Sequence, residues 1–350
     1  MNEADDFLRK GVAAQQRNDL NAAIDNYRKA LAIDPKLAEA RANLGAALSA
    51  AGQFDEAIEE DNKVLVSAPG NLGVRMNLGL AYYKKGDTEN AHTAFEAVHA
   101  ARPQDVAAAV LLGYTDINLG KSNQAAAMLT PLENGRESNM DLEYVLAYAL
   151  INSGEQAAGL PRMEKVAKAT RSADAYFIAG TARLRRREFH EARADLDAAI
   201  DLHGNFPELY TMAGQARDAL GDTPAAQSAF EQALKQDPKD FTANLYLGAM
   251  HLKQRDLDSA RPMLELALQL QPANPMARLQ MAKLNGMTGK YTEAAATLED
   301  LEKADPNWLD PHIELAAIYY KLHRPDDGQR ERGIVQQIEA SQQKAGPSKQ

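Results

Sequence analysis

The amino-acid sequence predicts an all-α protein in which a pair of antiparallel helices is repeated along the chain. The first observation is a proline that returns at one point of a 34-residue period, at Pro35, Pro69 and Pro103 and again at Pro238, Pro272 and Pro306. The second observation is a small residue at two fixed positions of the same period. The third is composition, because alanine is frequent and aromatic residues make up only 6% of the 350 residues. Many small residues in a periodic sequence indicate helices that approach one another closely.

The small residues occupy the eighth and the twentieth positions of each repeat. The eighth positions are Gly11, Gly45, Gly79, Gly113, Ala147, Gly180, Gly214, Gly248, Ala282 and Ala316. The twentieth positions are Ala23, Ala57, Ala91, Ala125, Gly159, Ala192, Ala226, Ala260, Ala294 and Gly328. We expect these two positions to lie on two helices that touch there, while larger residues such as Leu78, Phe95 and Val98 fill the space around the contact.

The turn between the two helices is predicted near the fifteenth position. Glycine stands there in six repeats, as Gly52, Gly86, Gly120, Gly154, Gly221 and Gly289. Glycine accepts the left-handed conformation that ends a helix. The proline at position 32 cannot continue the second helix and begins the link to the next repeat.

This order of Leu-Gly, Gly, Ala, an aromatic residue, Ala or Val, and Pro resembles the tetratricopeptide repeat family. The resemblance covers residues 4 to about 340 and implies a right-handed superhelical solenoid of about ten antiparallel helix pairs. The repeats start near Ala4, Ala38, Leu72, Val106, Met140, Ala173, Pro207, Phe241, Pro275 and Leu309. We therefore expect a single solenoid over residues 1–340. The last segment, 341–350, is rich in Gln, Lys, Gly and Pro and is expected to be a disordered tail.

Repeats four to six depart from the pattern. They lack the proline at position 32, and the step from Met140 to Ala173 is 33 residues long. Pro131 lies well inside the predicted second helix of repeat four, where it should kink or stop that helix. We expect a kink or a change in superhelical curvature near residues 131–140 and 168–173. The alternative is an array that passes through this region undisturbed.

Charge and composition exclude several classes of protein. With 39 basic and 49 acidic side chains, the net charge of −10 disfavours non-specific binding to nucleic acid or to an anionic membrane. The absence of Cys excludes disulfides, thiol nucleophiles and cysteine-ligated metals. The longest mostly apolar run, 107–112, is far shorter than the ~20 residues of a membrane span. The acidic start lacks the features of a secretory signal, so a cytoplasmic protein is expected as the sequence stands, or a periplasmic or secreted one if a leader was removed.

Few residues suggest chemistry, and we expect neither an enzyme nor a bound cofactor or metal. His92, Glu96 and His99 have a helical spacing that could hold a metal ion. The same positions of repeat one carry Ile24 and Leu31, which indicates a packing face and structural histidines. The basic run at 183–187 could meet an anionic partner, although the nearby acidic residues favour a solvated helix end.

The first helix of each repeat is the informative one for binding. In the family that the sequence resembles, this helix lines the concave surface through positions 2, 5, 6, 9, 12 and 13. Aromatic and aliphatic side chains gather at those positions in repeats three to six, whereas the outer repeats are smaller or more polar there. The predicted partner-binding groove consists of Met76, Asn77, Leu80, Tyr83, Val110, Tyr114, Ile117, Asn118, Tyr144, Tyr148, Ile151, Asn152 and Phe177. The alternative is that repeats three to six bury these residues against one another.

The sequence therefore predicts a protein–protein interaction module that binds an extended or helical segment of a partner in this groove. Tyrosine is favoured at interfaces, and asparagine can bond a peptide backbone. Neither nucleic acid nor a membrane span is expected. The alternative function is a self-associating scaffold whose end repeats make homo-oligomer contacts.

Overall fold

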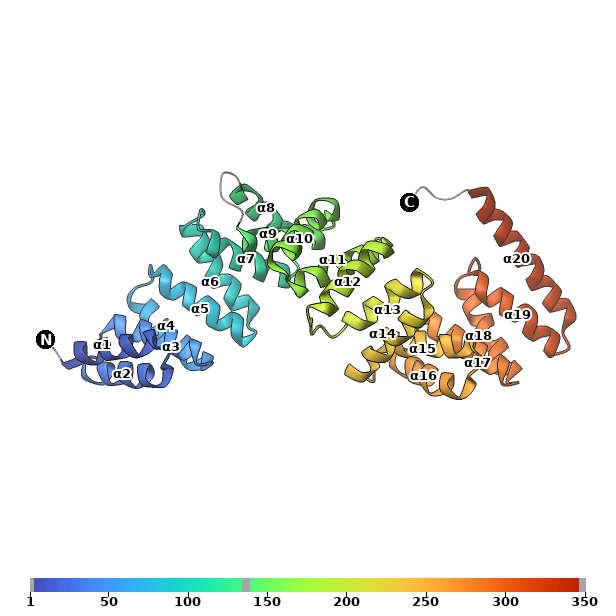
Figure 1. The fold of residues 1–350 in the computed structure, drawn as a ribbon, viewed down its shortest axis with the longest axis horizontal. Coiled ribbons are helices and arrows are strands. Elements are labelled where there is room, and N and C mark those ends of the chain that lie inside the picture. Colours follow the sequence, from blue (N-terminus) through green and yellow to red (C-terminus); the bar gives the residue numbers. More distant parts are fainter. Residues whose placement is uncertain (1–2, 134–138, 346–350) are drawn as a thin grey trace. The chain divides into compact units, whose positions relative to one another are not determined.

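The computed structural model describes residues 3–133 and 139–345, and all regular secondary structure in these two stretches is helical (Figure 1). The chain divides into two compact units, an N-terminal unit, Met1–Ala182, and a C-terminal unit, Arg183–Gln350. Each unit is described by itself below.

The helices follow one another in pairs. The N-terminal unit contains α1 (Glu3–Gln16), α2 (Leu20–Ile33), α3 (Ala38–Ala50), α4 (Phe54–Ser67), α5 (Leu72–Lys85), α6 (Thr88–Ala101), α7 (Val106–Asn118), α8 (Ser122–Leu129), the 3-10 helix η1 (Thr130–Glu133), α9 (Met140–Asn152), α10 (Gln156–Thr170) and most of α11 (Ala173–Arg185). The C-terminal unit contains α12 (Phe189–Asp201), α13 (Leu209–Ala219), α14 (Thr223–Gln236), α15 (Phe241–Lys253), α16 (Leu257–Leu270), α17 (Pro275–Met287), α18 (Tyr291–Ala304), α19 (Leu309–Lys321) and α20 (Pro325–Ala345).

The odd-numbered helices are the first helices of the predicted repeats. They begin at Glu3, Ala38, Leu72, Val106, Met140, Ala173, Leu209, Phe241, Pro275 and Leu309, each at a predicted repeat start or within two residues of it. Inside each unit a helix packs on its partner in the pair and on the first helix of the next repeat, as α5 does on α6 and α6 on α7. The predicted all-α fold of successive helix pairs is confirmed.

Local sequence fixes where many of these helices begin. An Asp or Asn side chain before the first turn accepts hydrogen bonds from the exposed backbone N–H groups there, a cap that contributes about 0.5–2 kcal/mol each. These capping residues are Asp19, Asn71, Asp87, Asp105, Asn139, Asp222, Asp240, Asp256 and Asn274. At the other end, the residue before each position-32 proline leaves the helical conformation, because proline disfavours it in its predecessor. Asp34 before Pro35 is an example, with an extended backbone.

The glycine at position eight permits the close contact within a helix pair. A Cβ atom placed on Gly79 of α5 would lie 2.5 Å from Cε1 of Phe95 on α6, closer than carbon atoms can approach. The same arrangement recurs between Gly11 and Tyr27, and between Gly214 and Phe230. The large residue at position 24 therefore packs directly against the small residue at position eight, as the repeat pattern predicts.

The turn inside each pair is left-handed in all ten repeats. The six predicted glycines have positive φ, and in the other four repeats the residue at position 15 adopts the same conformation without being glycine. These four residues are Asn18 (φ 59°), Arg187 (φ 62°), Arg255 (φ 60°) and His323 (φ 57°). The turn geometry is thus set by the packing of the pair, and glycine only makes it less strained.

Repeat four breaks the regular pattern where the sequence predicts. The second helix, α8, ends at Leu129, and the chain continues as the 3-10 helix η1, which contains Pro131. Proline removes a backbone donor and clashes with the preceding turn, so the α-helix stops. Residues 134–138, where the rest of this irregularity was expected, lie outside the described residues. In the second expected region, Arg171 adopts a left-handed conformation (φ 51°) at the end of α10.

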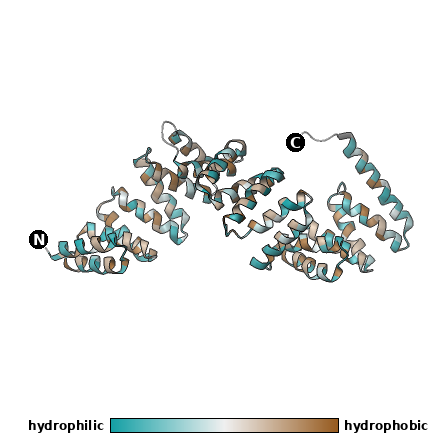
Figure 2. Cartoon of the chain, viewed as in Figure 1, coloured by the Kyte–Doolittle hydropathy of each residue, from teal (hydrophilic) through white to brown (hydrophobic). Residues whose placement is uncertain are grey.

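The C-terminal end differs from the expectation of a disordered tail beginning at residue 341. Helix α20 continues to Ala345, because Ser341 and its neighbours extend the same helical ladder, with the Ser341 hydroxyl donating to the Ile338 carbonyl at 2.7 Å. Residues 346–350 lie outside the described part. Figure 2 shows that this last helix is largely hydrophilic, as expected for the outer face of a terminal helix. None of the described helices is long and apolar enough to cross a membrane.

Candidate functional site

The first helices of the N-terminal unit carry a contiguous set of aromatic rings, which we call the tyrosine cluster: Tyr83 on α5, Tyr114 on α7, and Tyr144 and Tyr148 on α9. The ring of Tyr114 lies at the centre. Its centroid is 6.1 Å from that of Tyr83, 6.4 Å from that of Tyr144 and 6.5 Å from that of Tyr148. The rings of Tyr144 and Tyr148 are 6.3 Å apart. These spacings are typical of favourable aromatic pairs, so the cluster joins three consecutive repeats into one apolar surface.

The tyrosine cluster is neither core nor open surface. All four rings are half-buried. Tyr114, Tyr144 and Tyr148 pack on a core that includes Ala109, Leu142 and Val145. The pKa of Tyr114 is raised by this burial, and burial likewise raises the pKa of Tyr144. The Tyr144 hydroxyl also donates a hydrogen bond to the carboxylate of Asp174 on α11. The rings of the tyrosine cluster are therefore held in place by packing, and the Tyr144 hydroxyl is already engaged by Asp174.

Most of the predicted groove residues lie where a ligand could reach them. Nine are half-buried, namely Met76, Asn77, Leu80, Tyr83, Val110, Tyr114, Tyr144, Tyr148 and Phe177. Asn118 and Asn152, at the ends of their helices, are exposed. Two residues differ from the prediction, because Ile117 is only 8% exposed and Ile151 only 6%. Both isoleucines belong to the hydrophobic core clusters of the N-terminal unit and offer little surface to a partner.

A second candidate site lies in the C-terminal unit, where the sequence predicted a smaller and more polar surface. A cavity of about 640 Å³ opens between α13, α15 and α17, the first helices of repeats seven to nine. We call it the Tyr246 pocket. Its lining residues are Asp218, Thr223, Leu245, Tyr246, Ala249, Met250, Lys253, Gln254, Met276 and Gln280.

The Tyr246 pocket combines an apolar wall with a few charged groups. Tyr246 stacks on the buried ring of Phe230 with centroids 5.0 Å apart, so its position is fixed from beneath. Burial raises the pKa of the Asp218 carboxyl, and the nearby charge of Lys253 opposes that effect. The pKa of Tyr246 is raised by burial first and then by the charge of Asp218. Pockets of this size and composition suit one large side chain or a small ligand.

The sequence contained a signal for this pocket. Leu245, Tyr246, Ala249 and Lys253 occupy positions 5, 6, 9 and 13 of repeat eight, which are groove positions. Position-by-position reading identified repeats three to six because they hold more aromatic residues. It could not show that neighbouring helices leave a hollow beside Tyr246, because a cavity depends on how three helices pack.

Comparison with known proteins identifies the family. Models of the tetratricopeptide repeat match residues 14–52, 76–128, 211–275 and 251–317, together more than half of the chain. The chain belongs to the tetratricopeptide repeat family. Proteins of this family generally mediate protein–protein interactions, and their repeats are typically non-catalytic.

This tetratricopeptide repeat protein is similar to a solved structure over most of its length, and it spans less than a third of the length of the relatives that it matches by sequence. A crystal structure of a tetratricopeptide repeat protein from Parabacteroides merdae ATCC 43184 is similar with a TM-score of 0.56 and 16% identity, covering 76% of this chain and 98% of that one. At this identity the likeness shows the fold. A segment of 109 residues, 30% of this chain, is 32% identical to 8% of the cellulose synthase operon protein C of Pseudomonas fluorescens (strain SBW25). A segment of 157 residues, 40% of this chain, is 26% identical to 32% of the interferon-induced protein with tetratricopeptide repeats 2 of Mus musculus.

The two histidines singled out in the sequence of this tetratricopeptide repeat protein, His92 and His99, lie in different surroundings. His92 is paired with Asp116 of the following helix, with 2.8 Å between Nε2 and Oδ1. Nδ1 of His99 is buried and has no hydrogen-bond partner. In the basic run, Arg183 bonds to Asp195 at 2.5 Å and Arg186 to Glu188 at 2.7 Å, the arrangement expected of a helix end that is paired with its own acids.

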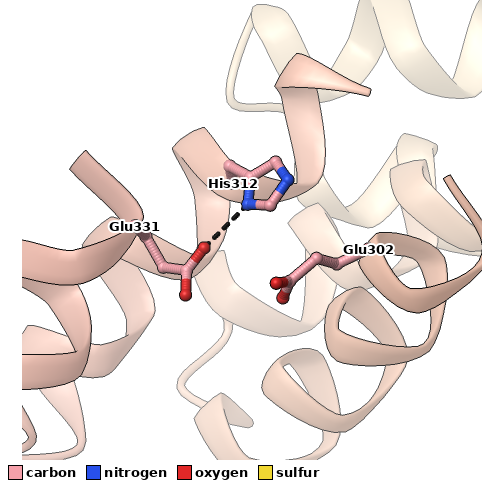
Figure 3. A group of neighbouring side chains, drawn as sticks. All are labelled: Glu302, His312 and Glu331. Atoms are coloured by element: carbon pink, nitrogen blue, oxygen red, sulfur yellow. Dashed lines mark hydrogen bonds and ion pairs between the residues drawn. The ribbon is translucent and has the colours of Figure 1, made fainter. Parts of the chain in front are cut away.

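A different group of side chains could hold a metal ion, and no sequence motif indicates it. Glu302 of α18, His312 of α19 and Glu331 of α20 bring one ligand atom each to within 4.8 Å of one another (Figure 3). Positions 302, 312 and 331 have no shared spacing that a sequence motif would reveal. Their convergence follows from the stacking of three successive helices.

Proposed function

We propose that this protein captures an extended or helical segment of a partner protein on its first-helix face, chiefly along repeats three to six. The observation that carries the proposal is the tyrosine cluster, whose four rings stay half-buried over three consecutive repeats. A contiguous apolar patch of this kind marks an interaction surface on a folded protein. Half-buried tyrosines are suited to binding. Their rings are already held by packing, so they lose less conformational entropy when a partner binds.

Polar groups next to the tyrosine cluster suggest how a bound segment would be oriented. Asn118 and Asn152 are exposed at the same edge of successive first helices, and Asn77 is half-buried one repeat earlier. Their amides can donate to and accept from a peptide backbone while the rings contact its side chains. We infer that the preferred partner segment carries aromatic or aliphatic side chains.

The Tyr246 pocket supports the same kind of function in the C-terminal unit. It is built from groove positions of repeats seven to nine, and its wall includes Leu245, Met250 and Met276. Methionine side chains adapt to differently shaped apolar groups. We infer that this pocket accepts one bulky apolar side chain of a bound segment.

The alternative of a self-associating scaffold has less support. Such a protein would present large apolar side chains on its end helices. The strongly exposed large hydrophobic residues are Ile33, Val66, Leu270, Met276, Met287, Ile313 and Tyr320. In the described part of the chain three of these residues lie in the end repeats, Ile33 on α2 and Ile313 and Tyr320 on α19, but none lies on the outermost helices, α1 and α20.

The proposal is tested with a displayed library of random peptides and the double variant Tyr114→Ala, Tyr148→Ala. We expect the wild-type protein to select peptides rich in aromatic and aliphatic residues. The double variant should bind the selected peptides at least tenfold more weakly, because tyrosines are enriched among the interface residues whose truncation costs ~2 kcal/mol or more. Binding is measured by fluorescence anisotropy of labelled peptides.

A matched control is Tyr291→Ala, which truncates a half-buried tyrosine at the start of a second helix, α18. It should bind the peptides as the wild type does. Circular dichroism of each variant checks the fold, and a milder pair, Tyr114→Phe and Tyr148→Phe, removes only the hydroxyl groups. Equal peptide binding by the wild type and a folded Ala double variant would contradict the proposal that the tyrosine cluster binds the partner segment. Light scattering on the same samples tests the scaffold, which a concentration-independent monomer excludes.

A further inference from the structure

The buried end of repeat ten holds an unusual set of three side chains. His312 and Glu331 are each only 1% exposed, and Glu302 is half-buried beside them. Nδ1 of His312 lies 2.7 Å from Oε2 of Glu331. Figure 3 shows the Glu302 carboxylate directed toward this pair from the neighbouring helix. Polar groups are buried this deeply only when they are paired or hold an ion.

Hydrogen-bond chemistry fixes which nitrogen of His312 faces the carboxylates. Nε2 lies 3.1 Å from the backbone carbonyl oxygen of Pro306, and a carbonyl can only accept. Nε2 therefore carries a hydrogen and donates it to Pro306. Nδ1 is left facing Oε2 of Glu331, and two lone pairs at 2.7 Å repel unless a positive centre lies between them. That centre is either a proton or a metal ion.

The second carboxylate favours the metal ion. The carboxylates of Glu302 and Glu331 face the same small space, with one oxygen of each within 4.8 Å of the other. Arg330 pairs with the other oxygen of Glu331, with 3.6 Å between Nε and Oε1, and the Arg330 side chain is mostly exposed. A single proton between His312 and Glu331 does not neutralise Glu302. A divalent cation would neutralise both carboxylates at once.

The geometry is close to that of a bound cation. Zinc bonds to histidine nitrogen and carboxylate oxygen are about 2.0–2.2 Å long, so two ligand atoms of one ion are at most about 4.4 Å apart. The three ligand atoms here lie within 4.8 Å of one another, which is close to that limit. The bond from His312 to a backbone carbonyl is also what orients histidine ligands in zinc proteins.

We propose that Glu302, His312 and Glu331 form a binding site for a divalent cation of the zinc class, with one nitrogen and two carboxylate ligands. Because the ligands come from α18, α19 and α20, the ion would fasten the last helix of the array to the two helices before it. The site is separate from the first-helix face and does not depend on peptide binding.

The test uses the full chain without a histidine tag, stripped of metal with a chelator and titrated with Zn²⁺ in a calorimeter. We expect one saturable Zn²⁺ ion per chain. Glu302→Gln should weaken binding at least tenfold while leaving the His312–Glu331 hydrogen bond in place. The matched control is Glu339→Gln, an exposed carboxylate on α20, which should bind Zn²⁺ as the wild type does.

A second measurement does not depend on the calorimeter. Hydrogen exchange of α20 should slow when Zn²⁺ is added to the wild type, and this protection should be absent in Glu302→Gln. If His312→Gln unfolds the last repeat, Glu302→Gln still decides the question. The absence of one-to-one binding, or equal binding by wild type and Glu302→Gln, overturns the proposal and leaves a proton shared by His312 and Glu331.

Discussion

Asp61 is a charged residue at a buried packing position of its repeat. It occupies position 24 of repeat two, where other repeats place large apolar residues such as Tyr27, Phe95 and Phe230. Its side chain is 0% exposed, and neither carboxylate oxygen has a hydrogen-bond partner. Burial, followed by the charge of Glu60, raises the pKa of Asp61 to about 7 from an ordinary value of 3.8. A buried carboxylate without a partner destabilises the folded state.

We predict that the contribution of Asp61 to the stability of the protein falls as pH rises from about 4 to 7. The folded state holds the Asp61 proton more tightly than the unfolded chain does, so the stabilising contribution is complete below pH 3.8 and lost by about pH 7. The shift corresponds to about 4 kcal/mol. Asp61→Leu should therefore raise the free energy of unfolding at pH 8 by a few kcal/mol, measured by urea denaturation.

Asp61→Asn serves as the control for charge, because it keeps the shape and polarity but does not titrate. It should remove the Asp61 contribution to the pH dependence without the full gain in stability of Asp61→Leu. An unchanged pH dependence in both variants would show that other groups produce it.

The helix pair is the element that the repeat encodes, and its turn shows how packing overrides local preference. Arg187 and Arg255 adopt the left-handed conformation that six repeats assign to glycine. A residue other than glycine costs about 1–2 kcal/mol in this conformation. Glycine avoids that strain, but it loses more chain entropy on folding, so its net advantage is smaller. The antiparallel packing of the pair is therefore strong enough to impose the turn on arginine.

We predict that Arg255→Gly stabilises the protein by up to about 1 kcal/mol, because glycine relieves the left-handed strain in the turn between α15 and α16. The free energy of unfolding from urea denaturation measures the change. The control is Arg261→Gly, inside α16, where glycine should destabilise by about 1 kcal/mol. A loss of stability in Arg255→Gly would mean that the arginine side chain contributes more than the turn costs.

At the scale of the whole chain, the helices of each unit contact mainly the helices next to them in sequence, which determines how far the effect of a substitution spreads. Each repeat contacts mainly its neighbours, so stability is close to a sum of repeat and interface contributions. Clusters of core residues follow the chain in order, from Leu8 to Ala81 at one end and from Leu279 to Tyr319 near the other. A change in one repeat should therefore act locally.

We predict that Gly79→Ala destabilises the protein by about 1–3 kcal/mol, because the added methyl group meets the ring of Phe95. Hydrogen exchange should accelerate in α5, α6 and their neighbours and stay unchanged in α17 to α19. The control is Gly73→Ala on the same helix, where a Cβ atom meets only the Asn71 side chain at 3.5 Å. Uniform acceleration of hydrogen exchange over all helices would contradict the expectation that a change in one repeat acts locally.

The fold was readable from the sequence because its determinants are local and repeated. Gly79, Ala91 and Phe95 lie within 17 residues of one another, and their equivalents recur in repeat after repeat. Small residues, turn glycines and prolines act through sterics over one helix pair, so their positions locate the helices. The stop at Pro131 follows from the same reasoning.

Side-chain burial and the convergence of distant residues required the tertiary structure. Ile117 and Ile151 occupy groove positions but are buried in the core. The Tyr246 pocket opens in repeats that the sequence predicted to be smaller or more polar on this face. Glu302, His312 and Glu331 converge from three different helices. The periodic pattern specifies which helix face packs. It does not specify how far neighbouring helices separate, and separations of a few ångströms decide whether a side chain is buried, lines a cavity or reaches a shared ion.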